Sequence, residues 1–138
     1  FLGDISGFVE AHRAHPLLGA EVETLAAGQE SLMSAAMGLL SWSQTGQLGL
    51  IALNANRFLG MMSRLAVGWL LLEGAVIADA AQATLGDGHV DRAFYEGKKQ
   101  AALWFARNEL PRVEADARLM TLGDASPMSI PDDGFAAA

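Results

Sequence analysis

Two histidines near the beginning of the chain, His12 and His15, have a spacing that metal chemistry can use. A helix places residues three apart on one face, where two imidazoles can bind the same ion. Glu10 lies close in sequence, but no third or fourth ligand follows, and Pro16 ends the helix. The pattern therefore predicts no metal site. A small metal-dependent helical enzyme that uses these histidines and nearby acids stays open as an alternative, although the chain lacks the paired Glu-x-x-His arrangement of di-iron bundles.

Other catalytic motifs are missing or incomplete in the sequence. The chain has no cysteine and no Gly-x-Ser-x-Gly nucleophile elbow. Gly86-Asp87-Gly88 lacks the third glycine and the preceding strand of a dinucleotide-binding loop. His89, between Asp87 and Asp91, is typical of a turn that caps a helix. We therefore predict no catalytic, cofactor-binding or metal-ligating residue in this chain.

Two charged residues lie in the most apolar part of the sequence and need partners. Arg64 and Glu73 are the polar residues that we expect to be trapped there, and an unpaired buried charge costs several kcal/mol. The candidate partners for Glu73 are Lys98, Lys99 and Arg107.

The three tryptophans admit two interpretations. Aromatic residues at helical spacing are typical of a core, and this is the interpretation we adopt. The alternative is that they line a flavin or acyl pocket. The residues are Trp42, Trp69 and Trp104.

The composition favours one acidic domain. The 138 residues fit a single domain, and 51% hydrophobic residues supply core material. Sixteen acids against nine bases give a net charge of −7, which argues against nucleic-acid binding. The absence of cysteine fits a cytoplasmic location. The chain begins at Phe1 without methionine or signal peptide, as an excised piece of a larger protein would.

One stretch, Phe58 to Ala81, is long enough to span a bilayer. Arg64, Glu73 and Asp79 lie inside it, and three charges in one span are costly. We therefore expect a buried helix of a soluble bundle and no membrane.

The chain shows helical periodicity and few strand signals. We predict four main helices, with a further turn or two over Arg112 to Met120: Asp4–Ala14, Ala20–Gln44, Leu50–Leu85 and Asp91 to Pro111. Asp91 is the expected N-cap of the fourth. The predicted fold is all-α, an up-and-down four-helix bundle with a long central helix. It comprises residues 1–120, and residues 121–138 form a flexible tail.

The periodicity also predicts which faces are buried. The expected inner face of the second helix comprises Val22, Leu25, Leu32, Met33, Ala36, Leu39 and Leu40. One face of the fourth helix comprises Phe94, Gly97, Ala101, Trp104, Phe105 and Asn108. Three glycines in the long helix indicate close helix–helix approach, namely Gly60, Gly68 and Gly74.

Part of the chain resembles a known family. The run Leu65–Leu72 and the pattern Phe94-Tyr95, Lys98, Ala101-Ala102, Phe105 and Leu110-Pro111 resemble the C-terminal extra domain of bacterial acyl-CoA dehydrogenases, of the methylmercaptopropionyl-CoA dehydrogenase type. The resemblance spans Ala20 to Arg118. The ending Met128–Phe135 is also similar to the short acidic ending of such proteins.

The resemblance implies an architectural role. The enzyme that such a domain completes binds FAD and removes the α-proton of an acyl-CoA. The β-hydride passes to flavin N5, and an electron carrier reoxidises the flavin. These parts would lie upstream of Phe1, so the segment itself would hold no cofactor and be inactive. It would brace the upstream dehydrogenase domains of the same chain, extend a subunit interface in a homo-oligomer, or narrow the acyl-CoA entrance. A stand-alone helical oligomerisation or interaction module is the alternative.

One motif imitates the catalytic base of the family. In the classical acyl-CoA dehydrogenases the base is the glutamate of a Tyr-Glu-Gly-Thr motif, and this chain has the similar run Tyr95-Glu96-Gly97. Here Lys98 follows in place of threonine, and the segment is predicted to be mid-helix. We therefore interpret Glu96 as a solvated surface acid.

Overall fold

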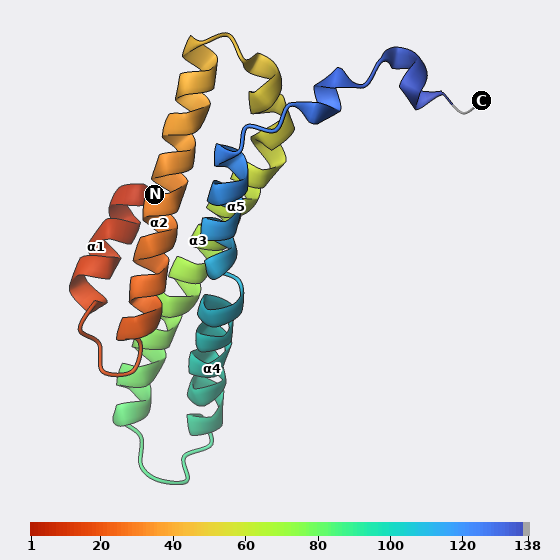
Figure 1. Ribbon diagram of the computed structural model, residues 1–138. Coiled ribbons are helices and arrows are strands. Elements are labelled where there is room, and N and C mark those ends of the chain that lie inside the picture. The colour runs from red at the N-terminus through yellow and green to blue at the C-terminus, as the bar shows by residue number, and fades with distance from the viewer. Residues whose placement is uncertain (137–138) are drawn as a thin grey trace.

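The computed structural model describes residues 1–136, which contain five α-helices and no strand (Figure 1). The prediction of an all-α fold is confirmed. The helices are α1 (Leu2–His12), α2 (Gly19–Gln44), α3 (Leu48–Ala83), α4 (Arg92–Asn108) and α5 (Pro111–Thr121). Two short 3-10 helices follow, η1 (Ser126–Ser129) and η2 (Asp132–Phe135).

The helices form four rods, since α4 and α5 follow one another end to end (Figure 1). α2 and α3 form a long hairpin, and α1 lies beside the first half of α2. α4 and α5 lie along the second and first halves of α3 respectively. α3 contacts each of the other four α-helices, so it occupies the centre of the arrangement.

The predicted fourth helix is divided at a proline. α4 ends at Asn108, and the N–H groups of Glu109 and Leu110 both bond the carbonyl of Phe105. Pro111, which has no N–H, then occupies the first position of α5. Asp91 immediately precedes α4 as predicted, but its side chain makes no capping hydrogen bond.

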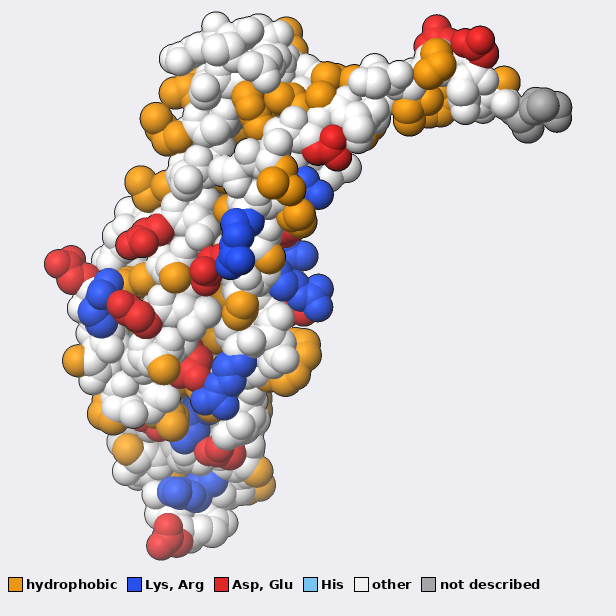
Figure 2. Space-filling view, in the orientation of Figure 1, with side chains coloured by type: hydrophobic (Ala, Val, Ile, Leu, Met, Phe, Trp, Pro, Cys, Tyr) orange, Lys and Arg blue, Asp and Glu red, His pale blue; other side chains and the backbone are white. Residues whose placement is uncertain are grey.

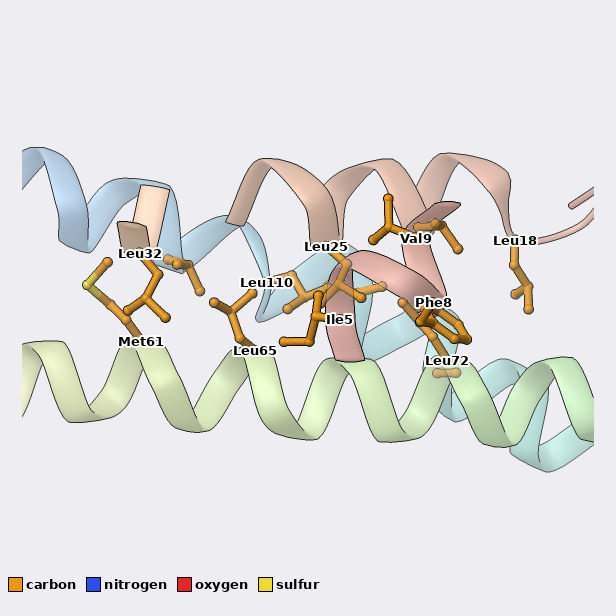
Figure 3. Packing of buried hydrophobic residues seen from close by; sticks show 14 of the residues in the cluster. Ile5, Phe8, Val9, Leu18, Leu25, Leu32, Met61, Leu65, Leu72 and Leu110 are labelled. Carbon is orange, nitrogen blue, oxygen red and sulfur yellow. The ribbon is translucent and has the colours of Figure 1, made fainter. Parts of the chain in front are cut away.

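The core lies between the central helix α3 and the helices around it, α1, α2, α4 and α5. Figure 3 shows apolar side chains of α1 and α2 pointing toward those of α3. Fully buried members include Ile5, Val22, Leu25, Met61, Leu65, Leu72, Leu110 and Val113. Removal of these side chains from water is the main stabilising contribution in a domain of this size.

Two predicted helix faces are wrong in part. On α2, Val22, Leu25 and Leu32 are buried as expected, but Met33 and Leu40 are exposed and Ala35 is buried instead. Both sides of this stretch are apolar, so periodicity alone does not fix its orientation.

On α4 the face that contains Phe94 and Trp104 is mostly exposed, although Phe105 packs partly buried against the core. Phe94 is 61% exposed and Trp104 is 59% exposed, so the assignment of Trp104 to the core is wrong. The buried face consists of Lys99, Ala102, Leu103 and Ala106. Alanine allows the backbone of α4 to lie close to its neighbours, which the larger aromatic residues would prevent.

The predicted role of glycine is confirmed at one position of three. A Cβ atom on Gly68 would lie 2.6 Å from Cδ2 of Leu110, so only glycine fits there. A Cβ on Gly60 would meet only the Arg64 guanidinium, at 3.3 Å, and a Cβ on Gly74 would meet nothing within 4 Å. At these two positions no other helix of the described residues packs closely, so the predicted helix–helix approach within the bundle is wrong there.

One end of the hairpin carries no charge. From Ser31 to Asn56, through the second half of α2 and the start of α3, there is no acidic or basic residue. Exposed apolar side chains on this stretch include Met33, Met37, Leu40, Leu48 and Leu53. In Figure 2 the end that holds the α2–α3 turn shows neither blue nor red, whereas charges of both signs cover the rest of the rods.

By length and composition, α3 could cross a membrane. In its most apolar stretch, fewer than half of the residues are buried within the domain. Central helices of soluble domains have the same property, so this measure alone does not place α3 in a bilayer.

The tail leaves the bundle after α5 (Figure 1). The side chain of Met128 packs on Gly49 at the beginning of α3, where glycine leaves room for it. No residue of η1 or η2 is buried. The flexibility of residues 121–138 stays a prediction, and Ala137 and Ala138 lie outside the described residues.

Candidate functional site

The histidine pair belongs to the turn between α1 and α2. Nδ1 of His15 accepts hydrogen bonds from the N–H groups of Leu17 and Leu18, at 3.2 and 3.3 Å. The ring of His12 packs on Phe8, with centroids 4.7 Å apart. Within residues 1–136, no group of three or more histidine, cysteine, aspartate or glutamate side chains is arranged to hold a metal ion. Through the two hydrogen bonds that it accepts, His15 caps the backbone of this turn.

Replacement of His15 with alanine should lower the free energy of unfolding by about 1 kcal/mol, because two N–H groups lose their acceptor. Metal content should not change. Thermal unfolding and elemental analysis of the purified chain test both parts. Loss of a stoichiometric metal in His15→Ala would favour the metalloenzyme alternative.

His89 also closes a turn. Its Nδ1 accepts a hydrogen bond from the N–H of Asp91 at 3.2 Å, and the Asp91 carboxylate lies 3.8 Å away. Both side chains are exposed on the loop before α4.

Glu96 belongs to a cluster around Lys99. Lys99 is 8% exposed, and its Nζ lies 3.2 Å from the Asp79 carboxylate and 3.1 Å from that of Glu96. Burial lowers the pKa of Lys99, but the hydrogen bonds that its ammonium donates to Glu96 and Asp79 outweigh burial and raise the pKa overall. Hydrogen bonds from Gln100 and Lys99 lower the pKa of Glu96. The cluster therefore consists of charged groups that join α3 to α4.

This geometry does not suit a general base. A base that removes a proton from carbon needs a pKa near the working pH, whereas the pKa of Glu96 is lowered. One of its carboxylate oxygens is 2.8 Å from the amide nitrogen of Gln100. The solvated surface acid predicted from the sequence is thus half-exposed and ion-paired.

In a whole dehydrogenase that contains this domain, Glu96→Gln should change turnover by less than about twofold, because loss of a true base typically costs 10²-fold or more. Steady-state kinetics with a saturating acyl-CoA measure this. A hundredfold fall in turnover with unchanged flavin content would identify Glu96 as the base.

A second charged cluster joins α3 to α5. Nη1 of Arg64 lies 2.9 Å from the Asp116 carboxylate, and its Nε lies 3.6 Å from that of Glu109. Nε of Arg57 is 3.7 Å from Asp116. Arg64 is therefore partly buried and paired, in keeping with the sequence prediction.

The prediction for Glu73 is wrong. Its side chain is exposed and forms no ion pair within the described residues. Arg107, one of its expected partners, instead binds Glu21 of α2 at 2.8 Å, and that glutamate side chain is 6% exposed. The burial of Glu21 and Lys99 was not foreseen, since it depends on which faces of distant helices meet.

Several grooves interrupt the surface, including one between α1 and α2 and one between α3 and α4. The groove between α1 and α2 has a volume of about 520 Å³ and a mixed lining, in which apolar side chains alternate with charged ones that include Glu10, Arg13 and Glu30. The groove between α3 and α4 has a volume of about 450 Å³. We name it the α3–α4 groove; its lining residues are Leu70, Leu71, Gly74, Ala93, Phe94, Gly97, Lys98 and Ala101.

Comparison with known proteins shows to which family this chain belongs. Residues 1–131 match the family described as "Acetyl-CoA dehydrogenase C-terminal like". The chain belongs to this family. The match covers all five α-helices, so the acetyl-CoA dehydrogenase C-terminal-like domain is the whole bundle.

Named relatives of this C-terminal-like domain are acyl-CoA dehydrogenases. Over 138 residues it is 30% identical to the broad-specificity linear acyl-CoA dehydrogenase FadE5 of Mycobacterium tuberculosis, covering 96% of this chain and 22% of that protein. A butyryl-CoA dehydrogenase of Syntrophomonas wolfei is 34% identical over 86 residues, covering 62% of this chain and 14% of the relative.

Another butyryl-CoA dehydrogenase of S. wolfei is 26% identical over 135 residues, covering 98% of this chain and 22% of the relative. The chain thus spans between a seventh and a quarter of the curated relatives that it matches. The resemblance to acyl-CoA dehydrogenases is confirmed, and the methylmercaptopropionyl-CoA type stays a prediction.

Proposed function

We propose that this chain is the C-terminal structural and oligomerisation domain of an FAD-dependent acyl-CoA dehydrogenase. The observation that carries the proposal is the outer face of α3. Among the exposed residues of α3, Glu73 is the single charged one, and its neighbours on this face include Leu48, Leu59, Leu70 and Ile77. A helix face with several exposed apolar side chains is typical of an interaction site.

The other charges of α3 are already used inside the domain. Arg57 and Arg64 pair with α5, and Asp79 pairs with Lys99 of α4. These charged side chains of α3 therefore form ion pairs within the domain, and the exposed face of the helix is left mainly apolar and available to another domain or subunit. Burial of such a face contributes about 25 cal/mol per Å² of apolar surface.

In the proposed parent enzyme, upstream domains of the same chain bind FAD and carry the catalytic base. The base removes the α-proton of an acyl-CoA thioester, and the β-hydride passes to the flavin. This segment alone supplies no catalytic group. It braces the upstream domains, extends a subunit interface or narrows the acyl-CoA entrance, as an up-and-down four-helix bundle in a cytoplasmic homo-oligomer. The methylmercaptopropionyl-CoA type is the narrower form of this proposal.

The test is the visible absorption spectrum of the complete reading frame that contains this segment, with and without an acyl-CoA. A flavin spectrum that bleaches on addition of substrate is the expected result. Deletion of Phe1–Ala138 then shows whether the domain is needed for stability, for oligomer mass or for substrate affinity. Stoichiometric flavin on the purified segment alone would contradict the proposal that the upstream domains, and not this segment, bind FAD.

The same apolar face of α3 also suits a stand-alone helical oligomerisation module. A colourless protein of about this length, which associates in solution and does not bleach with acyl-CoA, would favour this second function.

A further inference from the structure

We propose that the α3–α4 groove is the docking site for an apolar segment of the dehydrogenase part of the same polypeptide. This inference rests on the proposed function and specifies which surface of the domain is covered. It concerns the groove lined by Leu70, Gly74, Phe94, Gly97 and their neighbours.

Exposed apolar side chains form the two sides of the groove, and glycines lie between them. Leu70 of α3 is 56% exposed and Phe94 of α4 is 61% exposed. A Cβ atom on Gly74 or on Gly97 would meet nothing within 4 Å. The space above both glycines is therefore open, and the bare helix backbone allows another chain to approach closely.

Packing inside the domain does not explain these two glycines. Glycine within a helix is less stable than alanine by about 1 kcal/mol. At Gly68 that cost has a visible reason, because Leu110 fills the space. At Gly74 and Gly97 no side chain of the domain uses the space. A segment that inserts apolar side chains between Leu70 and Phe94 would supply the missing reason.

The charges around the groove indicate which chemical type of segment can bind in it. Lys98 is its one charged lining residue, and Nζ of Lys98 lies 5.4 Å from the centre of the Phe94 ring. Its ammonium makes no ion pair with another part of residues 1–136. The best fit is a mainly apolar segment that places one carboxylate near Lys98. A net charge of −7 disfavours an anionic lipid surface as the occupant.

Covalent linkage favours the dehydrogenase part over a separate partner. In the relative that matches 96% of this chain, the matched region makes up 22% of a longer polypeptide. A segment linked to the domain by a short stretch of chain has an effective concentration in the millimolar range. A separate protein of equal affinity would need a higher concentration than this to displace it. An apolar groove beside such a segment is therefore filled from within the polypeptide.

The experiment compares Gly97→Leu with Gly7→Leu in the complete protein. Both positions are on exposed helix faces with nothing within 4 Å of a Cβ, so both variants keep the fold of the domain. Leucine at position 97 fills the groove, whereas leucine at position 7 lies on α1, away from it. Phe94→Ser, which removes one side of the groove, serves as a second variant.

Limited proteolysis of the junction before Phe1 reports undocking. We expect Gly97→Leu and Phe94→Ser to speed this cleavage by about tenfold, because cleavage follows the population of the open form. Gly7→Leu should be cleaved at the wild-type rate.

Cleavage of Gly97→Leu and Phe94→Ser at the wild-type rate would overturn the proposal. The proposal would also be overturned if light scattering showed half the wild-type molar mass for Gly97→Leu and Phe94→Ser while the junction was cleaved at the wild-type rate. A second copy of the chain, and not a segment of the same polypeptide, would then fill the groove. Absence of flavin from the wild-type protein would refute the proposed function itself. That failure is visible before any variant is made.

Discussion

Replacement of Gly68 with leucine is expected to lower the free energy of unfolding by about 3 kcal/mol or more, the upper range for an overpacked core. A single Cβ at this position would lie within 2.6–3.1 Å of three carbon atoms of Leu110. Leu110 is fully buried and directly precedes Pro111, so it has little freedom to move aside. The junction of α4 and α5 must therefore shift away from α3.

Gly74→Leu is the matched control, on the same helix but facing open space. It should raise the stability of the chain by a few tenths of a kcal/mol to about 1 kcal/mol, because leucine favours helix over glycine. Urea unfolding followed by circular dichroism measures both variants. Equal unfolding midpoints for the two would show that α3 and Leu110 do not meet as described.

The second large effect is expected for Leu65→Ala. Leu65 is fully buried, and its Cδ2 would lie 3.0 Å from a Cβ on Gly28 of α2. Val113 of α5 approaches the same point, so the leucine joins three helices. Truncation of such a side chain costs about 2–5 kcal/mol. A domain whose total stability is about 5–15 kcal/mol would lose a large part of it.

Leu70→Ala supplies the comparison for Leu65→Ala, with the same change five residues along α3. Leu70 is exposed, and its truncation should alter the stability of the isolated chain by no more than about 0.5 kcal/mol. Thermal unfolding of both variants tests the difference. A similar loss for both would mean that the orientation of α3 in the bundle is wrong.

Local signals in the sequence predicted the helices and several of their ends. Gln44 ends α2 as expected, and Pro111 separates α4 from α5, because glycine and proline act on the backbone within a few residues. The long central helix was predictable from an uninterrupted apolar stretch. The close approach at Gly68 was also predicted, although the sequence did not distinguish it from the open positions Gly60 and Gly74.

The orientation of the helices was harder to predict. α3 is apolar on the side that faces its bundle and on the side that faces outward, so burial could not be assigned from composition. Trp104 was placed inside for the same reason, but it is exposed. An apolar residue at an interface with another domain has the same pattern as one in a core.

Ion pairs between distant segments were beyond prediction. Lys99 pairs with Asp79, and Arg107 pairs with Glu21, which lies on another helix far back in the chain. Such pairs depend on helix register, which the sequence left open. For the candidate site, Glu96 was predicted to be a solvated surface acid, and its ion pair with Lys99 was not foreseen. The hydrogen bonds that His15 accepts in the turn between α1 and α2 were not foreseen either.

The charge-free end of the hairpin determines how its surroundings can be mapped. Trypsin has no cleavage site between Arg13 and Arg57, and reagents that couple lysines or carboxylates find no target between Glu30 and Arg57. Cross-linking by these chemistries would leave this end blank even if it were fully covered. The thioethers of Met33 and Met37 are exposed there and can be oxidised to sulfoxides. Protection of these two methionines from oxidative footprinting is therefore the signal that would show what lies against this end.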